Sequence, residues 1–307
     1  MHPVLAELVA PFEHLPESDA TALLAELYGL RAERLDRLDT ERDDTFRFTT
    51  DGRELVLKVA HPQDSEAIVD LQLRALVHAA ETDPELPLQT IVRTTDGELA
   101  TVWNGRVARV FTWMEGTLAR GLAPTPRQLH AAGAMLGRLS RALADFEHPA
   151  ADRQLAWDLT RLPILRELEP NEPTTEIIDR VERLVLPALD ELPHQVIHND
   201  FHPGNLLVDP ADPAYVTGIL DFGDTVRSAR VNDLGVALAY LTMGSSPWEA
   251  ARPFIAGYET VVPLLDRERA LLPHLVSARL VQRVLINGLL ERDAAANSHD
   301  GGLQTPQ

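Results

Sequence analysis

The sequence predicts an α+β fold with two lobes, a small antiparallel β-rich lobe followed by a larger helical lobe. The chain has 307 residues, which is long for one compact domain and favours two lobes. Residues 46–60 alternate apolar and polar side chains around Asp51 and Gly52, a pattern typical of a β-hairpin. From residue 127 to 146 apolar side chains recur every three or four positions, as on the buried face of a helix.

The other elements of the first lobe can be assigned in order along the chain. Residues 17–29 are expected to form an amphipathic helix, with Ser18 as its cap and Gly29 at its end. A second helix is expected over residues 65–81, where a serine precedes an apolar periodic run. Further strands are expected in three short apolar segments, residues 89–94, 99–103 and 106–112.

The rest of the chain favours helix, apart from one hairpin near residue 210. From Asn297 onward the sequence is polar and contains glycines and a proline, which is typical of a frayed end. We therefore expect four segments, namely an N-terminal lobe over 1–111, a hinge over 112–116, a helical lobe over 117–296 and a flexible tail over 297–307.

Charge and composition argue against several classes of partner and chemistry. The chain has 28 Lys and Arg against 47 Asp and Glu, a net charge of −19, which disfavours nucleic acid and anionic membranes and permits a cationic substrate. It has no cysteine, so disulfides, thiolate catalysis and Cys-ligated metals are excluded. No signal peptide or membrane-spanning stretch is recognised. We expect a cytoplasmic protein, and its oligomeric state stays open.

The segment from Val196 to Asp224 carries the clearest chemical pattern. Two apolar runs flank a turn-rich tip near residue 212, so they should pair as an antiparallel hairpin. This pairing would bring Asn205 and Asp221 together at the open end of the hairpin, and Asp200 would reach the same place from the preceding loop. Such oxygen ligands suit Mg²⁺ bound with phosphates. A carboxylate beside them can accept the proton of an attacking hydroxyl.

The pattern H-x-D-x-x-x-x-N followed by D-F-G matches a signature of phosphoryl transfer. On these residues the chain resembles the aminoglycoside phosphotransferase and choline kinase superfamily, small-molecule kinases with a protein-kinase-like fold. Residues 38–62 together with residues 216–224 look nearest to the hydroxylysine kinase branch. The resemblance extends over roughly residues 23–290. It implies that Asp200 is the catalytic base, that His198 braces the catalytic loop, and that Asn205 and Asp221 bind Mg²⁺. It also implies ATP, or GTP, as the phosphoryl donor.

Lys58 is the second anchor of this resemblance, because it stands in the middle of an apolar strand where an unpaired charge would be costly. The family equivalent holds the α- and β-phosphates and pairs with a helix glutamate. Here Gln72 stands at that position and could hydrogen-bond Lys58, so a glutamate there should be tolerated. Glu66 is the other candidate partner. The resemblance further implies that backbone groups of Thr112 and Met114 bind the adenine edge.

Two departures motivate an alternative function, a non-catalytic kinase-fold protein that binds nucleotide. One is Gln72, and the other is the predicted nucleotide loop, residues 38–46, which contains no glycine. A protein kinase is disfavoured because residues 224–232 leave no room for a peptide-binding segment. A zinc protease helix is disfavoured because Pro203 would break it.

The acceptor is expected to be a small hydroxylated molecule, an amine or an amino acid, whose identity the sequence leaves open. Trp157 and Asp158 resemble a short motif near the acceptor cleft of the hydroxylysine kinase branch. This implies a tryptophan facing a cation and an aspartate pairing with it, the alternative being a core Trp with a surface Asp. Asp224 is expected to support the metal ligands, and Asp233 to cap a helix.

Overall fold

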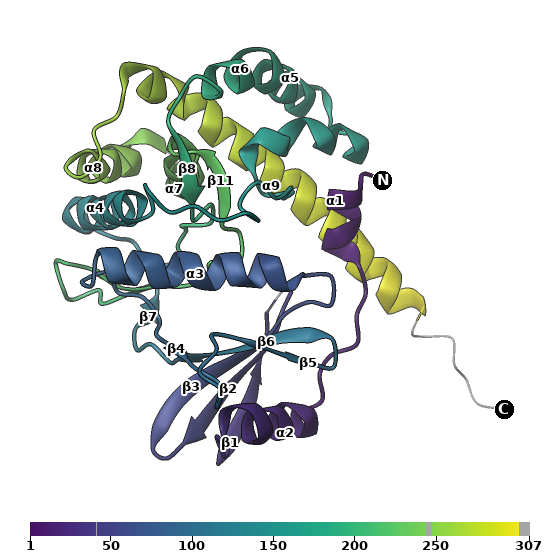
Figure 1. Cartoon of the computed structure of the whole chain (residues 1–307). Coiled ribbons are helices and arrows are strands. Elements are labelled where there is room, and N and C mark those ends of the chain that lie inside the picture. The colour runs from purple at the N-terminus through teal and green to yellow at the C-terminus, as the bar shows by residue number, and fades with distance from the viewer. Residues whose placement is uncertain (41, 244–246, 301–307) are drawn as a thin grey trace.

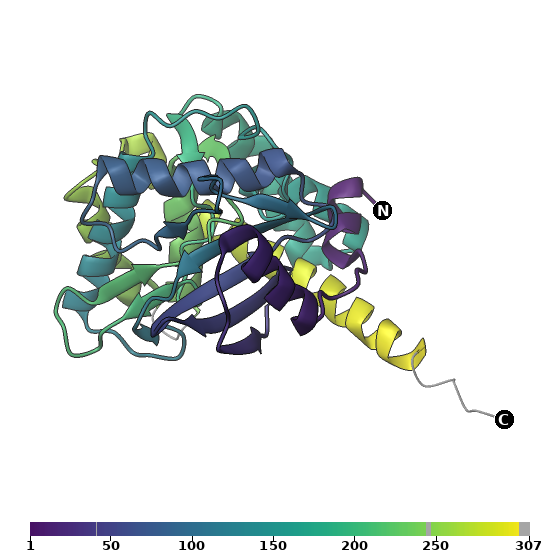
Figure 2. The same ribbon diagram turned by 60° about the horizontal axis from the view of Figure 1, so that its bottom comes forward.

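The computed structural model describes residues 1–40, 42–243 and 247–300. The first lobe is built on an antiparallel sheet with strands in the order β1 (Arg34–Leu38), β2 (Asp44–Thr50), β3 (Arg53–Val59), β6 (Arg106–Thr112) and β4 (Ile91–Val92), and β5 (Thr101–Trp103) also pairs with β6. Helix α2 (Glu17–Tyr28) covers one face of this sheet. Helix α3 (Glu66–Thr82) lies on the other face, between the sheet and the second lobe (Figures 1 and 2).

The local predictions for this lobe are confirmed with one exception. Strands β2 and β3 form the expected hairpin, in which Asp51 and Gly52 have φ angles of 48° and 70°, as a tight I′ turn requires. The Ser65 side chain caps α3. The cap predicted at Ser18 is wrong, because α2 begins at Glu17 and Ser18 lies inside its first turn. Strand β1 was not expected from the charged sequence RLDRL, which suits the edge of the sheet.

The N-terminal residues do not lie with the β-sheet. Helix α1 (Pro3–Ala6) and the following 3₁₀ turn (Glu7–Val9) pack beside the long helix α9 of the second lobe, with Val4 and Leu5 in that lobe's core (Figure 1). The chain therefore starts on the helical lobe and crosses to the sheet.

The second lobe is mainly helical. Its helical segments are α4 (Pro126–Ala142), a 3₁₀ segment (Leu159–Leu168), α5 (Glu172–Arg180), a π-helical turn (Val181–Val185), α6 (Leu186–Leu189), α7 (Val231–Leu241), α8 (Pro247–Glu259) and α9 (Asp266–Asp300). Two glycines allow α4 and α8 to approach closely, because a Cβ at Gly133 would clash with the carbonyl of Phe254 and one at Gly257 with that of His130.

Two small antiparallel sheets interrupt these helices. The predicted hairpin is present as β9 (Leu206–Val208) and β10 (Val216–Ile219), with β7 (Thr117–Leu118) added at its edge. The expectation of a single hairpin was wrong, because β8 (His194–Ile197) pairs with β11 (Val226–Ala229). Since β11 occupies the segment after D-F-G, no peptide-binding loop forms there.

Two further observations concern the ends of the chain and its helices. Helix α9 continues to Asp300, so it includes the start of the predicted tail, and residues 301–307 lie outside the described part. In the described ranges, no helix combines the length and apolar character needed to cross a membrane.

Candidate active site

The hairpin β9–β10 brings the predicted site residues together as expected. Leu206 faces Ile219 in the register, and the Leu220 amide donates a 2.8 Å hydrogen bond to the Asn205 carbonyl just beyond the strands. Asn205 therefore lies beside the backbone that leads directly into Asp221.

Asp200 has partners on both carboxylate oxygens. Its Oδ1 accepts a 2.8 Å hydrogen bond from Arg279, and its Oδ2 accepts one of 2.7 Å from the Asn205 amide and lies 3.2 Å from His202 Nε2. Burial alone would raise the pKa of Asp200, but the hydrogen bond from His202 and the charge of Arg279 outweigh it and hold this pKa below its usual value. The carboxylate is thus ionised and fixed in orientation while its side chain remains 21% exposed.

His198 and Asp233 hold this loop from behind. The His198 Nδ1 accepts from the Asp200 amide at 3.2 Å, so Nε2 carries the proton and donates to the Leu220 carbonyl at 3.1 Å. His198 therefore braces the loop, and because it is fully buried and acts through the backbone of Asp200 and Leu220, it is a positioning residue. Asp233 is not a helix cap. It lies inside α7, where its carboxylate accepts from the amides of His198 and Asn199 at 3.1 and 2.7 Å.

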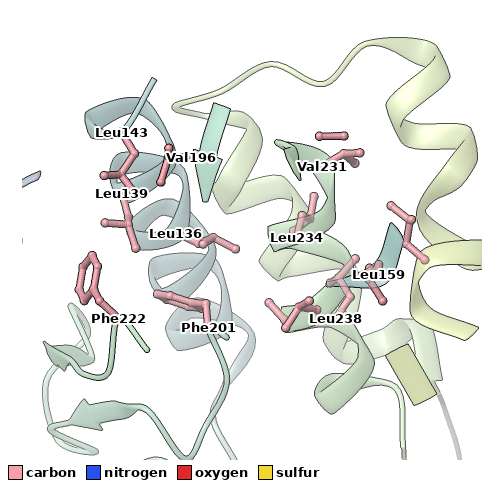
Figure 3. Packing of buried hydrophobic residues seen from close by; sticks show 14 of the residues in the cluster. Leu136, Leu139, Leu143, Leu159, Val196, Phe201, Phe222, Val231, Leu234 and Leu238 are labelled. Carbon is pink, nitrogen blue, oxygen red and sulfur yellow. The ribbon is translucent and has the colours of Figure 1, made fainter. Parts of the chain in front are cut away.

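Asp200 and Asp221 are each followed in the chain by a buried phenylalanine. Phe201 follows Asp200, Phe222 follows Asp221, and both rings lie beside α4 in the core of the helical lobe (Figure 3). Because an aromatic side chain buries a large apolar surface, these rings anchor the backbone at both carboxylates.

Lys58 pairs with Asp221 across the two lobes. Their Nζ and Oδ2 atoms are 3.0 Å apart, and the lysine ammonium holds the pKa of the Asp221 carboxyl well below its usual range. Asp221 also has a φ of 60°, a left-handed conformation that is uncommon outside glycine and that often marks a functional site. Neither candidate partner of Lys58 was right, since Glu66 is exposed on the first turn of α3 and Gln72 bonds elsewhere.

Gln72 links α3 to both sides of the cleft. Its Nε2 donates to the Gly223 carbonyl at 3.3 Å, and its Oε1 accepts from Arg109 at 3.4 Å. An amide suits this place because it both donates and accepts, whereas a carboxylate only accepts. Together with Lys58 and Asp221, Gln72 and Arg109 line one cavity between the lobes.

The oxygen atoms at this place fit a cation that arrives with phosphates. No group of three or more His, Asp or Glu side chains among the described residues could hold a metal alone. Asn205 uses its amide nitrogen for Asp200, which leaves its oxygen as a ligand, and Asp221 adds a carboxylate. Mg²⁺ in proteins is commonly held by one or two such side chains together with substrate phosphates.

The two hinge residues expected to bind adenine, Thr112 and Met114, differ in how their backbone groups are already used. The Thr112 amide already donates to the Thr90 carbonyl at 2.9 Å, and the Thr112 carbonyl accepts from Gln89 at 3.1 Å. Met114 follows, beyond the end of β6, and its backbone is not part of the sheet. The hinge contact to adenine stays a prediction for both residues, with Met114 the better placed.

The expectation that Trp157 faces the cation of the acceptor stays a prediction, because the cation over its ring in this structure is the guanidinium of Arg279, at 4.6 Å. The expectation for Asp158 was wrong. Asp158 is buried and caps the 3₁₀ segment through Thr160, so neither the acceptor contact nor a surface position holds for it. Burial and the nearby Asp200 carboxylate raise the pKa of Asp224 to about 7. Its predicted support of the metal ligands stays a prediction.

Sequence reasoning missed two arginines of the cleft. Arg109 interrupts an apolar strand just as Lys58 does, so the same argument could have found it. Arg279 stands among buried positions of α9 such as Leu275, Val276 and Gln282. A charged residue on the buried face of a helix could have indicated a functional role for Arg279.

The fold and the cleft together define a small-molecule phosphotransferase with a protein-kinase-like fold. The chain belongs to the phosphotransferase enzyme family, whose model matches residues 35–284. It is similar to hydroxylysine kinase from Danio rerio, with 29% identity over 298 residues that cover 89% of this chain and 83% of that protein. It is also similar to homoserine kinase from Polaromonas naphthalenivorans (strain CJ2), with 29% identity over 230 residues and 71% of each chain covered.

Solved structures confirm the fold. An amicoumacin kinase in complex with AMP-PNP, Ca²⁺ and Ami matches with a TM-score of 0.73 at 18% identity, covering 95% of this chain and 89% of that one. A microcompartment-associated aminopropanol kinase matches with a TM-score of 0.72 at 21% identity, covering 91% and 94%.

Proposed function

We propose that this protein transfers the γ-phosphoryl group of ATP to a hydroxyl group of a small amine or amino acid. GTP is the alternative donor, and Mg²⁺ is the expected cation. The observation that supports this most directly is the placement of Asp200 against Asn205, with Asn205 in turn beside the backbone of Asp221. A proton acceptor and two oxygen ligands for a nucleotide-bound cation thereby lie at one end of the cleft.

In this proposal the transfer is a displacement at the γ-phosphorus. The acceptor oxygen forms a bond to phosphorus, the bond from phosphorus to the β–γ bridging oxygen breaks, and the hydroxyl proton moves to the Asp200 carboxylate. Lys58 leaves Asp221 and holds the phosphates. Asn205 and Asp221 would hold Mg²⁺, which would neutralise part of the negative charge of the phosphates.

The acceptor class is supported by charge and by the relatives. Two of the relatives are named as kinases of hydroxylysine and homoserine, which are hydroxy amino acids. The net charge of −19 and the ionised carboxylate of Asp200 favour an acceptor that carries an ammonium group.

The test is ADP release from ATP and Mg²⁺ with a panel of hydroxy amino acids, amino alcohols and aminoglycosides. With the best acceptor, Asp200→Asn should lower turnover by about 10²–10⁴-fold, the usual contribution of a general base, while ATP affinity changes by less than about threefold. Asp221→Asn should weaken Mg²⁺-dependent ATP binding as well.

The matched control is Asp209→Asn, an exposed aspartate at the tip of the same hairpin, which should retain turnover. If Asp200→Asn kept wild-type turnover, the catalytic assignment of this loop would be wrong. ATP binding without turnover would then favour the nucleotide-binding alternative.

A further inference from the structure

Arg109 is a second cation in the cleft, next to Lys58. The two residues face each other in the register of β3 and β6, and both line the cavity that Asp221 also lines. Arg109 is only 5% exposed, and its charge reaches Asp221, whose pKa it helps to lower. A buried arginine must have partners, because an unpaired buried charge is strongly unfavourable.

The partners of Arg109 satisfy only part of its guanidinium. Its Nη2 donates to Asp43 Oδ2 at 2.7 Å and to the Gln72 Oε1 at 3.4 Å. Its Nη1 is buried and has no hydrogen-bond acceptor among the described residues. An arginine held purely for structure commonly pairs with a carboxylate through two parallel bonds. Here one donor of the guanidinium is left without a partner, on a residue that lines a cavity between the lobes.

Asp43 comes from the segment between β1 and β2, where a kinase-like fold carries its nucleotide loop. Its side chain is 13% exposed and reaches inward to Arg109. Lys58 and Arg109 both line this cavity, and each is paired with one carboxylate, Lys58 with Asp221 and Arg109 with Asp43. A phosphate group offers more acceptor oxygens than a carboxylate and could engage both terminal nitrogens of Arg109.

We infer that Arg109 is a second cation for the nucleotide phosphates, and that Asp43 occupies the place of a phosphate until nucleotide binds. This inference rests on the proposed nucleotide site. Binding exchanges one ion pair for another: Arg109 leaves Asp43 for phosphate oxygens, which also satisfy Nη1. The predicted nucleotide loop, which has no glycine, then acts through the Asp43 carboxylate, which competes with the nucleotide phosphates for Arg109.

The opposite interpretation is that the Arg109–Asp43 pair is a fixed latch that shapes the loop. The two interpretations predict opposite effects for Asp43. If Asp43 competes with phosphate, its removal strengthens nucleotide binding. If the pair is a latch, its removal weakens nucleotide binding as much as removal of Arg109 does.

The experiment is calorimetric titration of the full chain with Mg²⁺–ATP and, separately, with adenosine. Arg109→Gln should weaken ATP binding by about ten- to a hundredfold, the effect of losing hydrogen bonds to a charged group. Asp43→Asn should tighten ATP binding, and Arg109→Lys should fall between Arg109→Gln and wild type. Adenosine affinity should not change, because adenosine has no phosphate.

The matched control is Arg34→Gln. Arg34 lies on the edge strand β1 of the same sheet, is 74% exposed and pairs with Asp36 at 2.7 Å, so this variant removes a positive charge away from the cleft. It should retain wild-type ATP affinity within about twofold, the effect of an exposed ion pair.

The inference is overturned if Asp43→Asn leaves ATP affinity unchanged or weakens it, or if Arg109→Gln weakens adenosine and ATP equally. Should Arg109→Gln fail to fold, Asp43→Asn decides alone, since it keeps Arg109. These outcomes are separate from the proposed function, which fails only if wild-type protein binds no Mg²⁺–ATP or transfers no phosphoryl group.

Discussion

Arg279 of α9 donates a 2.8 Å hydrogen bond to Asp200, although 79 residues separate them in the chain. The guanidinium lies over the ring of Trp157 and also donates to its carbonyl at 3.0 Å. With Arg279 on Oδ1 and Asn205 on Oδ2, the carboxylate of Asp200 cannot rotate freely. The C-terminal helix therefore takes part in placing the proposed base.

We expect Arg279→Met to reduce turnover by about tenfold or more while ATP affinity stays unchanged, because misplacement of a reacting group is costly in rate. Arg279→Lys should restore part of the turnover. The control is Arg267→Met on the same helix, where Arg267 is 75% exposed and pairs with Glu191 at the surface. Steady-state kinetics and ATP titration check both. A lowered ATP affinity with unchanged turnover would contradict this placement role.

Asp44 is a buried carboxylate on the face of the first lobe's β-sheet that points away from the cleft. It accepts hydrogen bonds from the Leu15 amide at 2.9 Å, from Arg106 at 2.7 Å, and from His14 and Arg37. Burial alone would raise its pKa, but these donors outweigh burial and lower it. We expect Asp44→Asn to reduce the free energy of unfolding at pH 7 by about 3–5 kcal/mol, as for other broken buried ion pairs.

The sign of the pH dependence follows from the lowered pKa of Asp44. Its stabilisation is present above the unfolded pKa of about 3.9 and is lost as the pH falls through the lower folded value. The Tm difference between wild type and Asp44→Asn should therefore be largest near neutral pH and shrink below about pH 4. The surface variant Asp36→Asn is the control, with little effect at any pH. A difference that grew with acidification would contradict this account.

Gly133 allows α4 to pack directly against the backbone of α8. Since a Cβ there would clash with the Phe254 carbonyl, Gly133→Ala should destabilise the protein by about 1–3 kcal/mol despite the better helix propensity of alanine. Gly288→Ala in α9 is the control, because its Cβ would meet only the end of the Arg292 side chain. It should leave Tm unchanged or raise it. Equal Tm changes in the two variants would show that the helices can separate without cost.

The sequence predicted correctly those features that depend on residues close together in the chain. The turn at Asp51 and Gly52 and the cap at Ser65 follow from neighbouring residues, and they were right. The meeting of Asn205 with Asp221 was predictable because a short hairpin joins them. The pairing of β8 with β11 and the contact of Arg279 with Asp200 were not, since both join segments far apart in the chain.

The same limit applied to Lys58, whose partner was sought on the neighbouring helix and lies in the other lobe. A family pattern placed Gln72 beside the lysine, but only the packed structure shows that Gln72 must donate to Gly223 and accept from Arg109. The Gln72 amide therefore belongs to a different hydrogen-bond network from the expected one, and the expected effect of replacing it on ATP affinity is reversed.

From the sequence, Gln72→Glu should be tolerated, but the structure predicts the opposite. A glutamate would lose the donor to the Gly223 carbonyl, place a negative charge beside that oxygen, and give Arg109 a permanent anionic partner. We expect ATP affinity to fall by roughly three- to tenfold, the effect of about one hydrogen bond. The exposed Gln63→Glu, with the same charge change before α3, should bind ATP as wild type does. ATP titration of both variants decides, and tighter binding by Gln72→Glu would restore the expectation that this side chain serves Lys58.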